Sequence, residues 1–100
     1  MLKFKEIIEA VDGTYINGDL NIIASNYVID SRLIQEGDFF VPIIGDNVDG
    51  HKYIIDCVEK GAVGFFISKN VRNKEEIIEK SIKINNNICI VEVKDTYKAL

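Results

Sequence analysis

The sequence predicts a single small α/β domain in which helices flank a mainly parallel sheet. Between residues 38 and 93, apolar runs of strand length alternate with amphipathic stretches of helix length, in the order strand, helix, strand, helix, strand. Crossover connections of this kind are overwhelmingly right-handed and join parallel strands. The chain has 100 residues, of which 47% are hydrophobic. This hydrophobic fraction is enough for one core, and the chain is too short for a two-domain enzyme.

The first third of the chain predicts a helix followed by short strands. Apolar side chains at helical spacing predict an amphipathic helix over residues 3–11, and Gly13 stands where a left-handed residue would follow it. Turn-forming residues within 14–26 favour a brief strand or hairpin. Residues 27–30 predict a strand that ends at a polar cluster.

The remaining elements alternate between strand and helix. The apolar run 38–44 predicts a strand covered on both faces, with Pro42 either at a sheet edge or at a local irregularity. Asp49 is a suitable N-cap for a helix over 49–60 that Gly61 ends. Its buried side is predicted to carry Ile54, Ile55, Cys57 and Val58. Further along, the pattern predicts a strand over 62–67, a helix over 74–84 with Ile77, Ile78 and Ile82 inward, and a strand over 88–93. Asp95 would cap another helix that the sequence does not complete, which suggests a piece of a longer protein.

Charge and composition exclude several classes of function. Sixteen acidic residues oppose twelve basic ones, giving a net charge of -4, whereas a nucleic-acid binder needs a basic surface. The apolar runs are far shorter than the roughly 20 residues of a membrane span. Charges at the N-terminus interrupt any signal-peptide core. We therefore expect a monomeric, cytoplasmic protein that binds neither nucleic acid nor membrane.

Motifs for metal, phosphate-loop or nucleophilic chemistry are absent from the sequence. Cys57 and Cys89 lie far apart in apolar runs and are predicted to be buried, reduced thiols. With His51 as the single histidine, they cannot form a usual zinc site. No glycine is followed by lysine, which excludes an ATP-binding P-loop. We therefore predict no catalytic residue and no cofactor in this chain.

Two polar clusters follow neighbouring predicted strands. Asp30, Ser31 and Arg32 form the first, and residues 45–51 form the second. Ligands of open α/β sheets bind beyond the carboxyl ends of the strands, so the clusters should lie close together. The second cluster enters a helix, whose N–H groups favour an anion, while Arg32 offers a fork-shaped cation and Ser31 a hydroxyl. A phosphate-containing ligand suits this combination.

Structural explanations exist for the same residues. Asp30 and Arg32 are common turn and surface residues, and Asp49 is occupied as a helix cap. Asp46 adds negative charge that disfavours phosphate. His51, in the first turn of a helix, is better explained as a hydrogen-bonding anchor of the loop than as a catalytic base.

An ordered string of motifs runs along the chain: Asp30-Ser31-Arg32, Gly37-Asp38-Phe39-Phe40-Val41, Gly45, Asp49-Gly50-His51 and Gly61-Ala62. This string resembles the N-terminal domain of the Mur ligases, which extend the peptidoglycan precursor in the cytoplasm. Within that family, the opening helix, the Val41-Pro42 step and the Asp95-Thr96 ending look most similar to the ligase that adds D-alanyl-D-alanine to UDP-N-acetylmuramoyl-tripeptide. The sister ligase that adds lysine or diaminopimelate to the UDP-N-acetylmuramoyl-dipeptide is the alternative.

The resemblance implies that residues 1–100 hold the UDP end of the substrate. It places Ile29, Ser31 and Arg32 against the uridine diphosphate, and the loop of Asp46, Asn47 and Val48 over it through main-chain contacts. The residues that would shape this site are Asp30, Gly45, Asp49, Gly50 and His51. ATP and Mg²⁺ are expected for the full-length enzyme, whose central ATP-binding and C-terminal domains, absent from this chain, would bind ATP and the D-alanyl-D-alanine.

Two other classes of function use the same fold. One is a stand-alone interaction module, and the other is a free-standing protein that binds or senses a nucleotide sugar. The coding sequence after Leu100 distinguishes them, because only the ligase interpretation predicts a Gly-Lys-Thr-Thr-like loop there.

Overall fold

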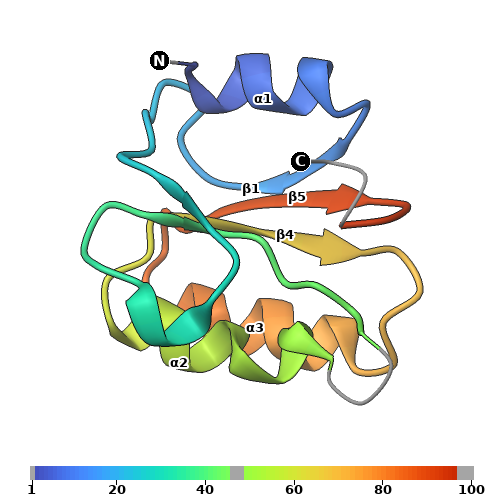
Figure 1. The fold of residues 1–100 in the computed structure, drawn as a ribbon. Helices are drawn as coiled ribbons and strands as arrows, with labels where there is room; N and C mark the ends of the chain where they lie inside the picture. The colour runs from blue at the N-terminus through green and yellow to red at the C-terminus, as the bar shows by residue number, and fades with distance from the viewer. Residues whose placement is uncertain (1, 46–48, 97–100) are drawn as a thin grey trace.

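The computed structural model describes residues 2–45 and 49–96 and contains one five-stranded sheet (Figure 1). The spatial order of the strands is β1-β5-β4-β3-β2. Four neighbouring strands, β2 to β5, run parallel, and β1 is antiparallel to β5 at one edge. The strands are β1 (Thr14–Asn17), β2 (Tyr27–Val28), β3 (Phe39–Phe40), β4 (Gly64–Ser68) and β5 (Cys89–Val93). This is the predicted small α/β domain with a mainly parallel sheet.

Helices cover both faces of the sheet. Helix α1 lies on one side, and α2 and α3 lie together on the other (Figure 1). The helical segments are α1 (Phe4–Ala10), the 3₁₀ helices η1 (Ser31–Leu33) and η2 (Gly50–Tyr53), α2 (Ile54–Glu59) and α3 (Lys74–Ile84). None of the described helices has the length and apolar content that a membrane-crossing segment requires.

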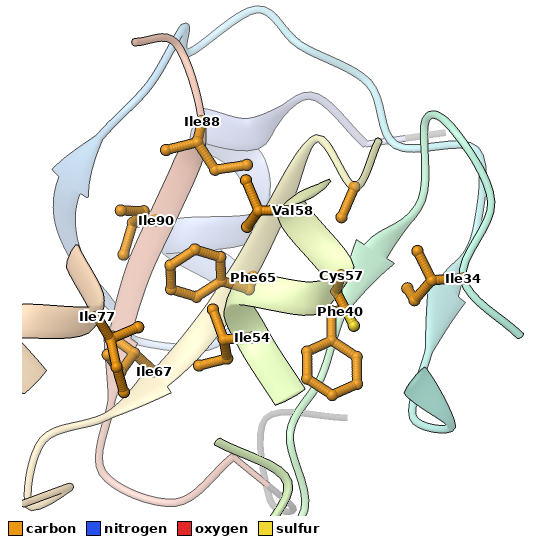
Figure 2. Packing of buried hydrophobic residues seen from close by; sticks show 11 residues of the cluster. Ile34, Phe40, Ile54, Cys57, Val58, Phe65, Ile67, Ile77, Ile88 and Ile90 are labelled. Atoms are coloured by element: carbon orange, nitrogen blue, oxygen red, sulfur yellow. The ribbon is translucent and has the colours of Figure 1, made fainter. Parts of the chain in front are cut away.

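Alternation along the strands divides the core into two clusters. Successive side chains of a strand point to opposite faces. Phe65 therefore packs against the helix pair α2 and α3, whereas Phe66 packs on the face that α1 covers. Figure 2 shows the ring of Phe65 among side chains from α2, α3 and β5, including Ile54, Ile77 and Ile90. The strands predicted over 62–67 and 88–93 and the helix predicted over 74–84 are thereby confirmed as elements of the core.

The two cysteines lie on opposite faces of the sheet. Cys57 and Cys89 are both buried and unpaired, as the sequence predicted. Burial raises the pKa of the Cys57 thiol to about 11 and that of the Cys89 thiol to about 12. Both sulfurs therefore remain protonated at neutral pH and pack as small apolar groups.

Three details differ from the sequence prediction. The strand predicted over 38–44 is limited to Phe39–Phe40, and Pro42 follows it as the local irregularity. Because proline has no N–H, it cannot extend the ladder of this interior strand. The helix predicted over 49–60 begins as the 3₁₀ helix η2 before α2. Ile55 is only half-buried, as are Ile78 and Ile82.

The end of α1 also differs. The left-handed residue is Asp12, with φ of 52°, rather than Gly13. Gly13 is required for another reason, because a Cβ there would overlap the Val91 side chain of β5. Residues 14–17 form a brief strand against β5, which is one of the two alternatives predicted for residues 14–26. The loop of residues 46–48 and the last four residues, which would follow the predicted Asp95 cap, lie outside the described residues.

Candidate functional site: a cleft at the ends of β2 and β3

The two predicted clusters line one cleft at the carboxyl ends of β2 and β3. Its volume is about 610 Å³. The parallel pairing of Tyr27 with Phe39 and of Val28 with Phe40 brings the two strand ends level, so the segments that follow them face each other. The cleft is lined by Ile29, Asp30, Ser31, Arg32, Phe40, Ile43, Gly45, Gly50 and Tyr53. The predicted closeness of the two clusters is therefore observed.

The first wall of the cleft consists of residues 29–32. Asp30 is the N-cap of η1, and its Oδ1 accepts a hydrogen bond of 3.0 Å from the Arg32 backbone N–H. The Arg32 guanidinium donates from Nε to Asp30 Oδ1 at 3.0 Å and from Nη2 to Oδ2 at 2.8 Å. These hydrogen bonds lower the pKa of the Asp30 carboxyl to about 2. Asp30 therefore orients Arg32 and offsets part of its charge.

Arg32 still has donors to offer a ligand. Its side chain is 85% exposed, and a guanidinium carries more N–H groups than the pair with Asp30 uses. The hydrogen bond to Asp30 also raises the pKa of Arg32, so it stays cationic. The predicted fork-shaped cation is present, held at the rim of the cleft by its carboxylate partner.

The second wall is formed by Gly50 and Tyr53 of η2. In a 3₁₀ helix, residues three apart lie on the same face, which places both of these residues toward the cleft. The Gly50 N–H donates to the Ile43 carbonyl at 2.9 Å, and Ile44 pairs with Asp49 in an antiparallel bridge. A Cβ on Gly50 would lie 2.8 Å from the Ile43 nitrogen, so this close approach requires glycine.

His51 lies behind the second wall, and only 3% of its surface is exposed. Its Nε2 accepts a hydrogen bond of 2.9 Å from the Ser68 backbone N–H at the end of β4. Its Nδ1 lies 2.7 Å from Asp49 Oδ1, which also accepts from the His51 backbone N–H. Since Nε2 must be an acceptor, Nδ1 carries the proton and the ring is neutral. His51 is therefore a structural anchor, as the sequence analysis favoured.

Sequence reasoning missed three residues of the cleft, namely Phe40, Ile43 and Tyr53. Phe40 was recognised as a buried strand residue, and strand alternation alone does not show that its ring borders a cleft. Tyr53 was missed because the helix was predicted to be α-helical from its first turn. A period of three from Gly50 would have found it. The predicted contacts of Asp46, Asn47 and Val48 fall outside the described residues.

Two kinds of site are missing, a phosphate-binding loop from the sequence and a metal-binding cluster from the described residues. The sequence contains no phosphate-binding loop of the Gly-Lys-Ser/Thr kind. Within residues 2–45 and 49–96, no group of three or more His, Cys, Asp or Glu side chains could hold a metal ion. We therefore derive no step of a reaction through either group on this chain.

A family comparison agrees with this geometry. Residues 24–98 match the family described as "Mur ligase family, catalytic domain". The chain belongs to the Mur ligase family. Solved structures of MurF from Acinetobacter baumannii share the fold, with a TM-score of 0.73 over 98% of this chain and 19% of theirs, at 18% sequence identity. That identity supports similarity of fold only.

Curated relatives within the Mur ligase family refine the comparison. A UDP-N-acetylmuramoyl-L-alanyl-D-glutamate--2,6-diaminopimelate ligase from Clostridioides difficile is 36% identical over 97% of this chain and 18% of its own length. The ligase of the same name from Clostridium perfringens is 33% identical over 96% of this chain and 18% of its own length. The chain thus spans less than a fifth of these relatives. Their names favour the alternative of the sequence analysis over its first choice, the ligase that adds D-alanyl-D-alanine.

Proposed function

We propose that this chain is the UDP-substrate-binding domain of a Mur ligase that extends UDP-N-acetylmuramoyl-dipeptide by diaminopimelate or lysine. Sequence identity to ligases named for diaminopimelate supports this choice within the family. ATP, Mg²⁺ and the incoming amino acid would be bound outside residues 1–100. The role of this chain would be to hold one end of the substrate while chemistry proceeds elsewhere.

The observation that carries the proposal is the convergence of residues 29–32 with Gly45, Gly50 and Tyr53 on one cleft. Ile43 and Tyr53 supply apolar surface suited to a flat base, and Ser31 and Arg32 supply donors suited to phosphate oxygens at the rim. The position beyond the carboxyl ends of parallel strands is where such sheets bind nucleotides. A uridine diphosphate combines these features.

A second candidate is the ligase that adds D-alanyl-D-alanine to UDP-N-acetylmuramoyl-tripeptide. The opening helix, the Val41-Pro42 step and the Asp95-Thr96 ending, which look similar to that ligase, support it, and the MurF structures share the fold. Both candidates bind a UDP-N-acetylmuramoyl-peptide, so the cleft serves either one. They differ in the length of the substrate peptide and in the group that is added, a single amino acid or a dipeptide, which parts of the protein outside residues 1–100 would select.

Nucleotide titrations test the proposal directly. Amide chemical shifts of the chain are followed by NMR while UDP, ADP or uridine is added. We expect saturable shifts at residues 29–32, 45 and 50–53 with UDP, weaker binding of uridine, which lacks the phosphates, and weaker binding of ADP, which has a larger base. Equal affinity for UDP and ADP, or no shift with UDP, would overturn the proposal.

An activity assay separates the two candidates. The protein encoded by the complete reading frame is supplied with ATP, Mg²⁺ and UDP-N-acetylmuramoyl-peptides of two or three residues. We expect phosphate release with the dipeptide substrate and diaminopimelate or lysine. Release only with the tripeptide substrate and D-alanyl-D-alanine would establish the second candidate instead.

A further inference from the structure

A buried hydrogen-bonded link joins the second wall of the cleft to the end of β4. His51 Nε2 accepts from the Ser68 N–H at 2.9 Å, and His51 Nδ1 faces Asp49 Oδ1 at 2.7 Å. Ser68 is the last residue of β4 and is only 6% exposed. Water therefore cannot readily replace the histidine as the partner of this N–H.

The hydrogen bond from Ser68 to His51 holds the 3₁₀ helix η2, to which both residues of the second wall belong. Gly50 and Tyr53 flank His51 in the same short 3₁₀ helix and line the cleft, while His51 is directed to β4. In a segment of four residues, a shift of one backbone position carries its neighbours with it. The side-chain acceptor on His51 thereby sets where the glycine backbone and the tyrosine ring stand.

Charged groups around His51 come from two elements. Asp49 and Lys52 belong to the same segment, whereas Glu76 and Lys80 of α3 line a hollow of about 240 Å³ that His51 also borders. Glu76 and Lys80 pair with each other at 2.8 Å, which leaves Asp49 as the carboxylate in direct contact. Asp49 accepts from Nδ1–H in either protonation state. Only the bond from Ser68 needs a neutral ring, because a protonated Nε2 is a donor.

We propose that His51 is a positioning residue of the nucleotide cleft, which fixes Gly50 and Tyr53 through the acceptor that its neutral ring offers to Ser68. The part of the inference that concerns ligand affinity rests on the proposed function. The position of the wall is a property of the unliganded protein and can be measured without any ligand.

Two substitutions and a matched control test the inference, with affinity for UDP as the readout. In His51→Ala the Ser68 N–H loses its partner, and we expect affinity to fall about tenfold, the equivalent of one hydrogen bond. His51→Gln keeps an oxygen acceptor near the Nε2 position, so affinity should be largely restored. Asn17→Ala is the control, because it removes two bonds to backbone carbonyls of residues 86 and 88. It should lower stability and leave affinity unchanged.

Amide shifts of the free protein add a readout that does not depend on any ligand. The Ser68 amide should shift in His51→Ala, where it has lost its acceptor, and so should that of Tyr53 in the wall. Both should return toward their wild-type positions in His51→Gln, and Asn17→Ala should leave them unchanged.

Three results would overturn the inference. These are wild-type affinity in His51→Ala, no recovery of affinity in His51→Gln, and a Tyr53 amide in free His51→Ala that keeps its wild-type shift. If the wild-type protein binds no UDP, the proposed function fails, and the amide shifts of the free protein still decide the role of His51.

Discussion

The two walls of the cleft are built in opposite ways. The first wall, residues 29–32, is held by an exposed pair between Asp30 and Arg32 and contains no buried residue in η1. The second wall, Gly50 and Tyr53, belongs to a segment in which Gly50 and His51 are buried and which leads directly into α2. The first wall is thus held by contacts at the surface, and the second wall is held by contacts in the core. We therefore expect the first wall to adjust to a ligand and the second to keep its position, and we call them the adjustable wall and the fixed wall.

The largest expected effect comes from truncating the support of the fixed wall. Ile54 follows η2 directly and is fully buried. Ile54→Ala should lower the free energy of unfolding by roughly 2 to 5 kcal/mol, because it leaves a cavity under α2. Leu33→Ala, at the end of η1 beside the first wall, is the matched control, since Leu33 is 66% exposed, and it should change stability by about 0.5 kcal/mol or less. Urea denaturation measures both, and equal losses would show that the two walls share one support.

The next effect concerns binding at the adjustable wall. Arg32→Ala should weaken UDP affinity by about 1 to 3 kcal/mol, the range for a charge-assisted hydrogen bond. Ser31→Ala should act in the same direction. Stability should change little, because the Arg32 side chain is exposed. Calorimetric titration measures the affinities, with Arg72→Ala as a charge-matched control away from the cleft. Unchanged affinity in both cleft variants would remove this wall from the site.

The sequence predicted the fold well where periodicity is strong. The helix over 74–84 and the strands around Phe65 and Ile90 follow directly from runs of isoleucine and phenylalanine at helical or strand spacing. It was less accurate over residues 41–45 and 49–53. There the backbone is set by tertiary contacts, above all the approach of Gly50 to Ile43 and the link of His51 to Ser68. No local pattern encodes such contacts.

The sequence located the strand ends that form the site, but it did not predict how the side chains there are arranged. The rule that ligands bind beyond carboxyl ends of parallel strands correctly predicted that residues 29–32 lie beside Gly45 and Gly50. It did not show that Asp30 would hold Arg32 by two hydrogen bonds. It also missed the tyrosine of the second wall, because that side chain faces the cleft only in a 3₁₀ turn.

A substitution in α3 is expected to change stability by less than Ile54→Ala and in the opposite direction. Ser81 lies in α3, the helix that packs beside α2, and is fully buried. Its hydroxyl has no hydrogen-bond partner among the described residues. Ser81→Ala should raise the free energy of unfolding by about 1 kcal/mol, because it removes an unsatisfied polar group and favours the helix. Affinity for UDP should not change. A loss of stability in thermal or urea unfolding would show that the hydroxyl does have a partner.

The smallest effect tests the pair that shapes the adjustable wall. Hydrogen bonds from Arg32 lower the pKa of Asp30 from 3.8 to about 2. A depressed carboxyl pKa contributes stability that is present above 3.8 and is lost as the pH falls through about 2. The ¹³C shift of the Asp30 carboxyl should therefore titrate near pH 2. In Arg32→Ala the midpoint should return toward 3.8, and Arg72→Ala should leave it unchanged. Titration of wild-type Asp30 at the ordinary value would mean that the pair is not maintained in solution. Arg32 would then be free to meet a phosphate without first being oriented by its neighbour.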